Sequence, residues 1–210
     1  MNLPNKLSLI RIILIPFTLL FMLPINIYGW QPEGWNSFVN AWGMTIAAVI
    51  FIVASLTDYF DGKIARRDNL VTNLGKFLDP LADKVLVISV LIGFLSLGRV
   101  NAWCVLIIIF RDFMISGVRL VAASHGEVLA AKMIGKVKTA VQMVAIIYML
   151  FEPMLFRIFS GNFMETPAYP LPTGWITILG DVFFYLCVIL TIVSGLDYLL
   201  KNISLFKDSK

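Results

Sequence analysis

Six long apolar segments, separated by short connections rich in polar or turn-forming residues, dominate the hydrophobicity pattern of this 210-residue chain. An α-helix needs about twenty apolar residues to cross the hydrocarbon core of a bilayer. The pattern predicts spanning helices at Leu7–Leu23, Ala41–Phe60, Pro80–Leu97, Ala102–Ala123, Val137–Phe156 and Trp175–Leu200. These segments occupy most of the chain, so we expect an all-α integral membrane protein with a single domain over residues 1–210.

The composition supports this class. Hydrophobic residues make up 59% of the chain and charged residues only 14%, whereas soluble domains carry about 25% charged residues. The first apolar segment is followed by Trp, Tyr and Pro rather than by a small-residue cleavage site, which favours an uncleaved span over a signal peptide. Cys104 and Cys187 both fall inside apolar segments, and we expect no disulfide.

The basic residues are distributed unevenly over the two sides of a six-span arrangement. Of the 17 lysines and arginines, only Arg99 and Arg157 fall on one side. The positive-inside rule therefore predicts that both termini and the Asp58–Asp83 connection face the cytoplasm of a cell-membrane protein. We attribute the net charge of +4 to this asymmetry and to contact with anionic membrane lipids, not to nucleic-acid binding.

Two pairs of aspartates flank the connection between the second and third predicted spans. Asp58 and Asp61 are three residues apart, and Asp79 and Asp83 are four apart, so each pair shares one face of a helix. Carboxylates at the ends of membrane-length helices are costly unless their charge is compensated. With oxygen ligands and no nearby Cys or His, Mg²⁺ or Mn²⁺ fits best, with Ca²⁺ next. The alternative is a solvated loop of mixed charge.

The start of the third predicted span allows two interpretations. Proline is favoured at the first helical position, and aspartate at the N-cap before it, so Asp79-Pro80 could begin the helix with Asp83 one turn inside. Alternatively the helix begins earlier and Pro80 only kinks it. Asp79 and Asp83 stay close in space in both cases.

Cationic residues in the fourth and fifth predicted spans are the second chemical feature of the chain. Arg111 falls at membrane depth, where an arginine should face a cavity or a partner, and Arg119 follows two turns later, near the cytoplasmic end of the span. Asp112, beside Arg111, offers an alternative role in an internal ion pair. Lys136 and Lys138 open the fifth span, where a basic cytoplasmic flank is the alternative explanation.

The aspartates belong to a longer motif that resembles a known signature. It reads Asp58-x-x-Asp61-Gly62-x-x-Ala65-Arg66, then eight residues, then Gly75-x-x-x-Asp79-x-x-x-Asp83. This pattern resembles the CDP-alcohol phosphotransferase family at all its defining positions. Further matches are an N-terminal Asn-x-x-Thr-x-x-Arg, with Ser in place of Thr, and the basic segments of the bacterial members that use glycerol 3-phosphate. Those members often carry Arg-Glu where this chain has Arg-Asp. The N-terminal match comprises Asn5, Ser8 and Arg11.

The resemblance implies a reaction and a set of roles. The expected substrate is CDP-diacylglycerol, whose phosphatidyl group passes to an acceptor alcohol with release of CMP. The family pattern implies two divalent ions, Mg²⁺ or Mn²⁺, held by Asp58, Asp61, Asp79 and Asp83, with Asp83 also the general base. The residues implied for the nucleotide are Asn5, Ser8, Gly62, Ala65, Arg66 and Gly75. A homodimer is likewise expected from the family.

We expect sn-glycerol 3-phosphate as the acceptor, with inositol phosphate, serine or phosphatidylglycerol as alternatives. A phosphorylated acceptor requires cations that the metal site does not supply, and Arg111, Arg119, Lys136 and Lys138 offer them. A cation- or proton-coupled transporter is the alternative from another functional class, because membrane carboxylates also mark ion pathways. Transporters place such residues near the midplane of repeated halves, whereas this sequence shows no repeat and gathers its aspartates at one surface.

Overall fold

The computed structural model describes the chain over residues 3–67, 73–124, 133–160 and 171–201. Side chains are described over these residues except at 3–8, 58–67, 73–81, 83 and 124. The described chain is helical, apart from turns and a single isolated bridge between Ile27 and Trp30. The fold class predicted from the sequence, an all-α protein, is therefore confirmed.

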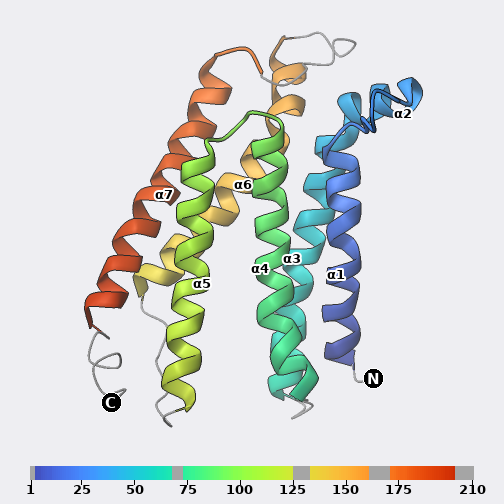
Figure 1. Ribbon diagram of the computed structural model, residues 1–210. Helices are drawn as coiled ribbons and strands as arrows, with labels where there is room; N and C mark the ends of the chain where they lie inside the picture. Colours follow the sequence, from blue (N-terminus) through green and yellow to red (C-terminus); the bar gives the residue numbers. More distant parts are fainter. Residues whose placement is uncertain (1–2, 68–72, 125–132, 161–170, 202–210) are drawn as a thin grey trace.

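Each of the six predicted segments corresponds to one long helix (Figure 1). These are α1 (Leu3–Met22), α3 (Met44–Arg67), α4 (Asn73–Ser96), α5 (Ala102–Ser124), α6 (Met133–Ser160) and α7 (Trp175–Lys201). The short helix α2 (Glu33–Phe38) and the π-helix η1 (Val39–Gly43) lead directly into α3. The helical stretch that delivers the first aspartate pair therefore runs unbroken from residue 33 to residue 67.

The helices form one bundle in which α1 packs against α3 and α4, while α6 packs against α3 and α7. Helix α5 contacts both α7 and α4. The start of α1 and the end of α7 lie at the same end of the bundle, drawn at the bottom of Figure 1 and here called the lower end. The end of α3, the start of α4, the end of α5 and the start of α6 lie there too. The opposite end is called the upper end.

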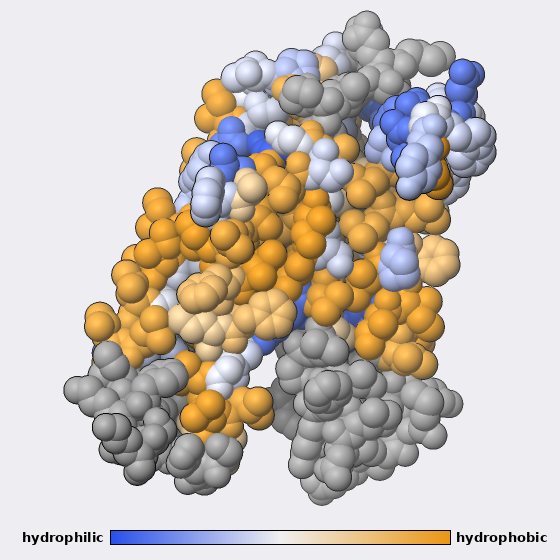
Figure 2. Space-filling view, viewed as in Figure 1, coloured by the Kyte–Doolittle hydropathy of each residue, from blue (hydrophilic) through white to orange (hydrophobic). Residues whose placement is uncertain are grey.

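The outer surface of the bundle is apolar. Figure 2 shows a broad band of hydrophobic side chains across the middle of the face in view, with hydrophilic side chains at the upper end. Large side chains on this surface include Phe110 on α5, 67% exposed, and Ile189 on α7, 58% exposed. Phe51 and Phe94, by contrast, are fully buried between helices. An apolar surface of this extent is unfavourable in water and natural against lipid tails, so the chain is a membrane protein.

Length and hydropathy identify three described helical stretches that could cross a membrane: Glu33–Thr57, Met133–Ser160 and Trp175–Lys201. Shorter apolar helices span Leu9–Met22 and Lys84–Ser96. Helix α5 has 23 residues but carries Arg111, Asp112 and Arg119. The count of six spans stays a prediction.

Helix α4 begins earlier than the Asp79-Pro80 cap would require. It starts at Asn73, so both Asp79 and Pro80 lie inside it, and the N-cap interpretation is wrong. The second interpretation, an earlier helix start, is correct. A local Asp-Pro signal fits a helix start, but proline is tolerated within membrane helices where neighbouring helices and local adjustments satisfy the freed carbonyl.

An ionic cluster in which Glu152 is fully buried and Asp181 is partly exposed joins three segments at the upper end. Arg99, in the turn between α4 and α5, donates two hydrogen bonds to Glu152 of α6, at 2.7 and 2.8 Å, and one to Asp181 of α7. Burial by itself lowers the pKa of Arg99, but the hydrogen bonds to these carboxylates outweigh it and raise the pKa above its usual range. Gly180 makes this contact possible, because an added Cβ there would overlap the Glu152 carboxylate.

Candidate active site

A cavity of about 500 Å³ opens between α4, α5 and α6 towards the lower end of the bundle. Its volume lies in the range of about 300–1,000 Å³ that is typical of small-molecule sites. Polar side chains from all three helices line it. They are Lys84 of α4, Arg111, Asp112, Ser116 and Arg119 of α5, and Lys136, Thr139 and Gln142 of α6.

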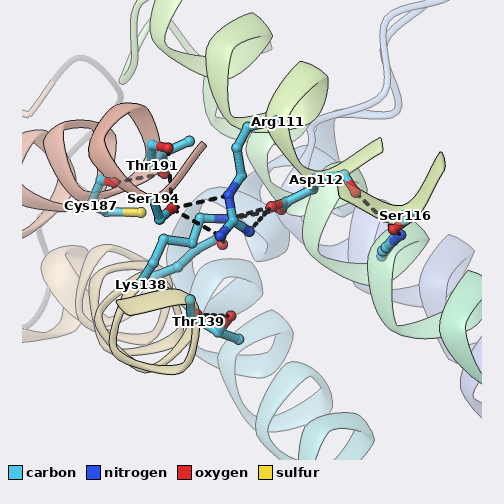
Figure 3. A network of polar contacts seen from close by, with 11 residues as sticks. Arg111, Asp112, Ser116, Lys138, Thr139, Cys187, Thr191 and Ser194 are labelled. Atoms are coloured by element: carbon cyan, nitrogen blue, oxygen red, sulfur yellow. Dashed lines mark hydrogen bonds and ion pairs between the residues drawn. The ribbon is translucent and has the colours of Figure 1, made fainter. Parts of the chain in front are cut away.

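Asp112 connects the two most buried cations of the site (Figure 3). Its carboxylate accepts hydrogen bonds from the Lys138 ammonium, with Nζ 2.7 and 2.8 Å from the two oxygens, and from Arg111 Nη1 at 2.9 Å. Lys138 is 1% exposed and donates again to Gln142 Oε1 at 2.7 Å. Lys138, which lies four residues before Gln142 on α6, thus contacts a carboxylate 26 residues before it in the sequence.

Helix α7 fixes the other side of Arg111. The hydroxyl of Ser194 accepts two hydrogen bonds from the guanidinium, 3.1 Å from Nε and 2.8 Å from Nη2, and donates to the Thr191 carbonyl. Gly195 leaves room for this arginine, since an added Cβ would lie only 3.1 Å from its Cγ. Arg111 is therefore held rigidly at the cavity wall.

Lys84 links the cavity to the helix that bears the second aspartate pair. It follows Asp83 directly on α4, and its ammonium donates to the Ser116 hydroxyl on α5. Ser116 in turn donates to the backbone oxygen of Asp112 at 2.9 Å. The cavity wall therefore begins one residue after Asp83 in the sequence.

The four predicted acceptor-binding cations are placed differently. Arg119 and Lys136 are exposed and line the same cavity. Arg111 lines it at greater depth in α5. Lys138 lies behind the wall, held by Asp112 and Gln142, and does not line the cavity.

The charge of the cavity favours an anion. Four cationic side chains line it, against one carboxylate among its lining residues, and that carboxylate is already shared by two cations. Guanidinium and ammonium groups at the edge of a low-dielectric region attract phosphate strongly, arginine through its planar fork and lysine as a point charge. The cations lining the cavity are Lys84, Arg111, Arg119 and Lys136.

Comparison with known proteins places these features in a family. The model of CDP-alcohol phosphatidyltransferases matches residues 1–193 of the chain. The chain belongs to the CDP-alcohol phosphatidyltransferase family. The resemblance found in the aspartate motif is therefore confirmed over most of the sequence.

Three relatives share a name, CDP-diacylglycerol–glycerol-3-phosphate 3-phosphatidyltransferase. The protein from Bacillus subtilis strain 168 is 41% identical over 208 residues, covering 99% of this chain and 98% of the relative. The proteins from Escherichia coli K12 and Shigella flexneri are each 37% identical over 205 residues, covering 94% of this chain and 93% of the relative. The similarity thus includes the segments that line the cavity.

CDP-alcohol phosphatidyltransferases generally depend on a divalent metal, and the aspartates of this chain suit one. Asp58 and Asp61 lie within the lower part of α3, and Asp79 and Asp83 within the lower part of α4, so each pair shares a helix face. Helices α3 and α4 contact each other. Four carboxylates without Cys or His form a donor set for a hard cation.

The side chains of the aspartate motif lie outside the described residues. The same holds for Asn5 and Ser8 on α1, although the helices that carry all these positions are described. Among the described side chains, no group of three or more His, Cys, Asp or Glu could hold a metal. The motif positions concerned are Asp58, Asp61, Gly62, Ala65, Arg66, Gly75, Asp79 and Asp83.

Several residues of the cavity region were not assigned to the site from the sequence. Lys84 resembles an ordinary basic flank, and Ser116 and Ser194 are small polar residues in apolar helices. The only signal for Gln142 in the sequence is that it follows Lys138 by four residues and so lies on the same side of a helix. A serine within a spanning segment is a weak signal for an interhelical hydrogen bond, and nothing local indicates which helix it will face.

Proposed function

We propose that this chain transfers the phosphatidyl group of CDP-diacylglycerol to sn-glycerol 3-phosphate, giving phosphatidylglycerophosphate and CMP. The observation that carries the proposal is the cationic cavity at the end of the bundle where the aspartate-bearing parts of α3 and α4 lie. The names of the relatives from Bacillus subtilis and Escherichia coli support the same reaction.

The choice of acceptor rests on the charge of the cavity. Arg119 and Lys136 are exposed at its wall and are the residues we assign to the acceptor phosphate. Arg111, fixed by Ser194, provides a third positive group at greater depth. Lys138 contributes indirectly, by holding the carboxylate of Asp112 that orients Arg111. An acceptor without phosphate would offer no anionic group to the exposed Arg119 and Lys136.

The proposed chemistry is an in-line displacement at the phosphorus that carries the diacylglycerol. The primary hydroxyl oxygen of the acceptor forms the new O–P bond, the bond to the CMP phosphate breaks, and CMP leaves with the electron pair. Asp83 takes the proton of the attacking hydroxyl, as a general base within hydrogen-bond reach would. Asp58, Asp61, Asp79 and Asp83 would hold two Mg²⁺ or Mn²⁺ ions, which when bound neutralise charge on the diphosphate.

The remaining roles follow the family pattern. We assign the cytidine nucleotide to residues of α1, α3 and α4 near the aspartates: Asn5, Ser8, Gly62, Ala65, Arg66 and Gly75. The small residues among them would let the ligand approach the helix backbone closely. We propose a single multi-pass domain in the cell membrane with both termini and the active site cytoplasmic, assembled as a homodimer.

The decisive experiment measures CMP release by the purified protein in detergent. CDP-diacylglycerol and Mg²⁺ are supplied with glycerol 3-phosphate, inositol phosphate, serine or phosphatidylglycerol in separate reactions. Glycerol 3-phosphate should support the highest rate, and EDTA should abolish it until Mg²⁺ is restored. A rate with serine or inositol phosphate that exceeds the rate with glycerol 3-phosphate would refute the acceptor. Full activity in EDTA would refute the metal.

A further inference from the structure

Gln142 is a buried residue of the cavity wall with an unused hydrogen-bond donor. It is 4% exposed, it lines the cavity, and its Nε2 has no hydrogen-bond partner within the described part of the chain. We propose that Gln142 binds the secondary, non-reacting hydroxyl of the acceptor and so selects a glycerol backbone. This inference rests on the proposed function and adds a specificity-determining residue to it.

The orientation of the Gln142 amide is fixed by its neighbours. Lys138 Nζ lies 2.7 Å from one end of the amide and can only donate, so that end must be the carbonyl oxygen. Lys138 is itself held by both oxygens of Asp112, at 2.7 and 2.8 Å. The amide nitrogen is therefore the other end, and it offers two N–H donors that no described group accepts.

A buried amide nitrogen without an acceptor is unusual, because burying a polar group without a hydrogen bond is unfavourable. The nitrogen itself is covered by neighbouring atoms, and a ligand oxygen would satisfy it once binding opens its contact with the adjoining cavity. The phosphate of the acceptor is better matched by the charged groups of Arg119 and Lys136, which line the same cavity. A neutral donor suits a neutral oxygen, and glycerol 3-phosphate has one hydroxyl that neither reacts nor carries phosphate.

The position of Gln142 along α6 agrees with this assignment. It follows Lys136 by six residues, so it lies deeper in the bundle than the residue assigned to the phosphate. One helix, α6, thus carries both the residue assigned to the phosphate and the residue assigned to the secondary hydroxyl on the central carbon.

The test compares two acceptors in the same protein sample. One is glycerol 3-phosphate, and the other is 3-hydroxypropyl phosphate, which keeps the phosphate and the reacting hydroxyl but lacks the secondary one. The wild type should prefer glycerol 3-phosphate by about tenfold in kcat/KM, the effect of one neutral hydrogen bond. Gln142→Met should reduce this preference to near one, because methionine has similar length and no donor.

The preference is a ratio within one sample, so loss of folded protein in the variant does not affect it. Tyr148→Phe is the control on the same helix, since its hydroxyl donates to the Ile176 carbonyl at 2.9 Å and does not line the cavity. This variant should keep the wild-type preference. An unchanged preference in Gln142→Met, or a wild type that uses both acceptors equally, overturns the inference alone. No CMP release by the wild type with glycerol 3-phosphate overturns the proposed function and the inference with it.

Discussion

At the scale of single residues, Asp112 holds together two cationic side chains that are largely withdrawn from solvent. Lys138 is 1% exposed, and Arg111 donates to the same carboxylate. Asp112→Asn removes the charge and leaves both cations without their counter-ion. Removing one partner of a buried pair costs roughly 3–5 kcal/mol, and the 18% exposure of Asp112 places the expected loss at the lower end.

Thermal unfolding of the purified protein in detergent measures this loss. Asp112→Glu is the matched control, because it keeps the charge and should recover most of the stability. An Asp112→Asn variant that unfolds at the wild-type temperature would contradict the structural role of this carboxylate.

Asp83 is the residue on which the proposed proton transfer depends. Asp83→Asn keeps the shape of the side chain but accepts a proton poorly, so turnover should fall by roughly 10²–10⁴-fold. Binding of CDP-diacylglycerol should largely survive, since an amide oxygen remains. CMP release and a separate nucleotide-binding assay measure the two effects. Turnover close to wild type would show that Asp83 is not the base.

Arg119 should act on the acceptor rather than on the lipid nucleotide. Its guanidinium can fork two phosphate oxygens, whereas a lysine at this position offers only a point charge. Arg119→Lys should therefore raise the KM for glycerol 3-phosphate about tenfold or more, the equivalent of one weakened charged hydrogen bond. The KM for CDP-diacylglycerol should stay nearly unchanged. The opposite pattern would assign this cation to the lipid nucleotide and weaken the choice of acceptor.

At the scale of the helices, the contact between α6 and α7 depends on a glycine at the upper end. An added Cβ at Gly180 would meet the Glu152 carboxylate and would lie 2.9 Å from Arg99 Nη2. Gly180→Ala should therefore destabilise the protein by about 1–3 kcal/mol, the usual cost of overpacking. Thermal unfolding in detergent measures the change.

Gly117 on α5 provides the matched control for this helix contact. An added Cβ there has no neighbour within 4 Å, and alanine favours an α-helix over glycine by about 0.5–1 kcal/mol. Gly117→Ala should be neutral or slightly stabilising. Equal destabilisation by the two substitutions would mean that the close approach at Gly180 is not the cause.

At the scale of the whole molecule, the two ends of the bundle allow a test of the membrane orientation that the basic residues predict. Asn101 lies exposed at the upper end, between α4 and α5, and Lys201 lies at the lower end, with its side chain 65% exposed. In a background with Cys104 and Cys187 replaced by alanine, Asn101→Cys should react with an impermeant thiol reagent in right-side-out vesicles. Lys201→Cys should react only after the vesicles are opened. The reverse pattern would place the aspartates and the cavity outside the cell.

The helices themselves could be predicted because each is determined by a continuous stretch of sequence. A run of about twenty apolar residues has few alternatives to a helix in lipid, where backbone groups must satisfy one another. The ends were less secure, as α4 shows: a local Asp-Pro signal suggested a helix start, yet the helix begins at Asn73. The aspartate motif could also be recognised from the sequence, because all its positions lie between Asp58 and Asp83.

What the sequence determined by itself was therefore the all-helical membrane class, the aspartate pairs and the family. The tertiary structure decided the cavity, because its contacts join residues far apart in the chain. Arg111 meets Ser194 across 83 residues, and Lys84 meets Ser116 across 32. It also decided that Lys138 is buried behind Asp112 while Lys136, two residues earlier, faces the cavity. Successive residues of a helix point in different directions, and only the packing of the neighbouring helices determines which direction is the site.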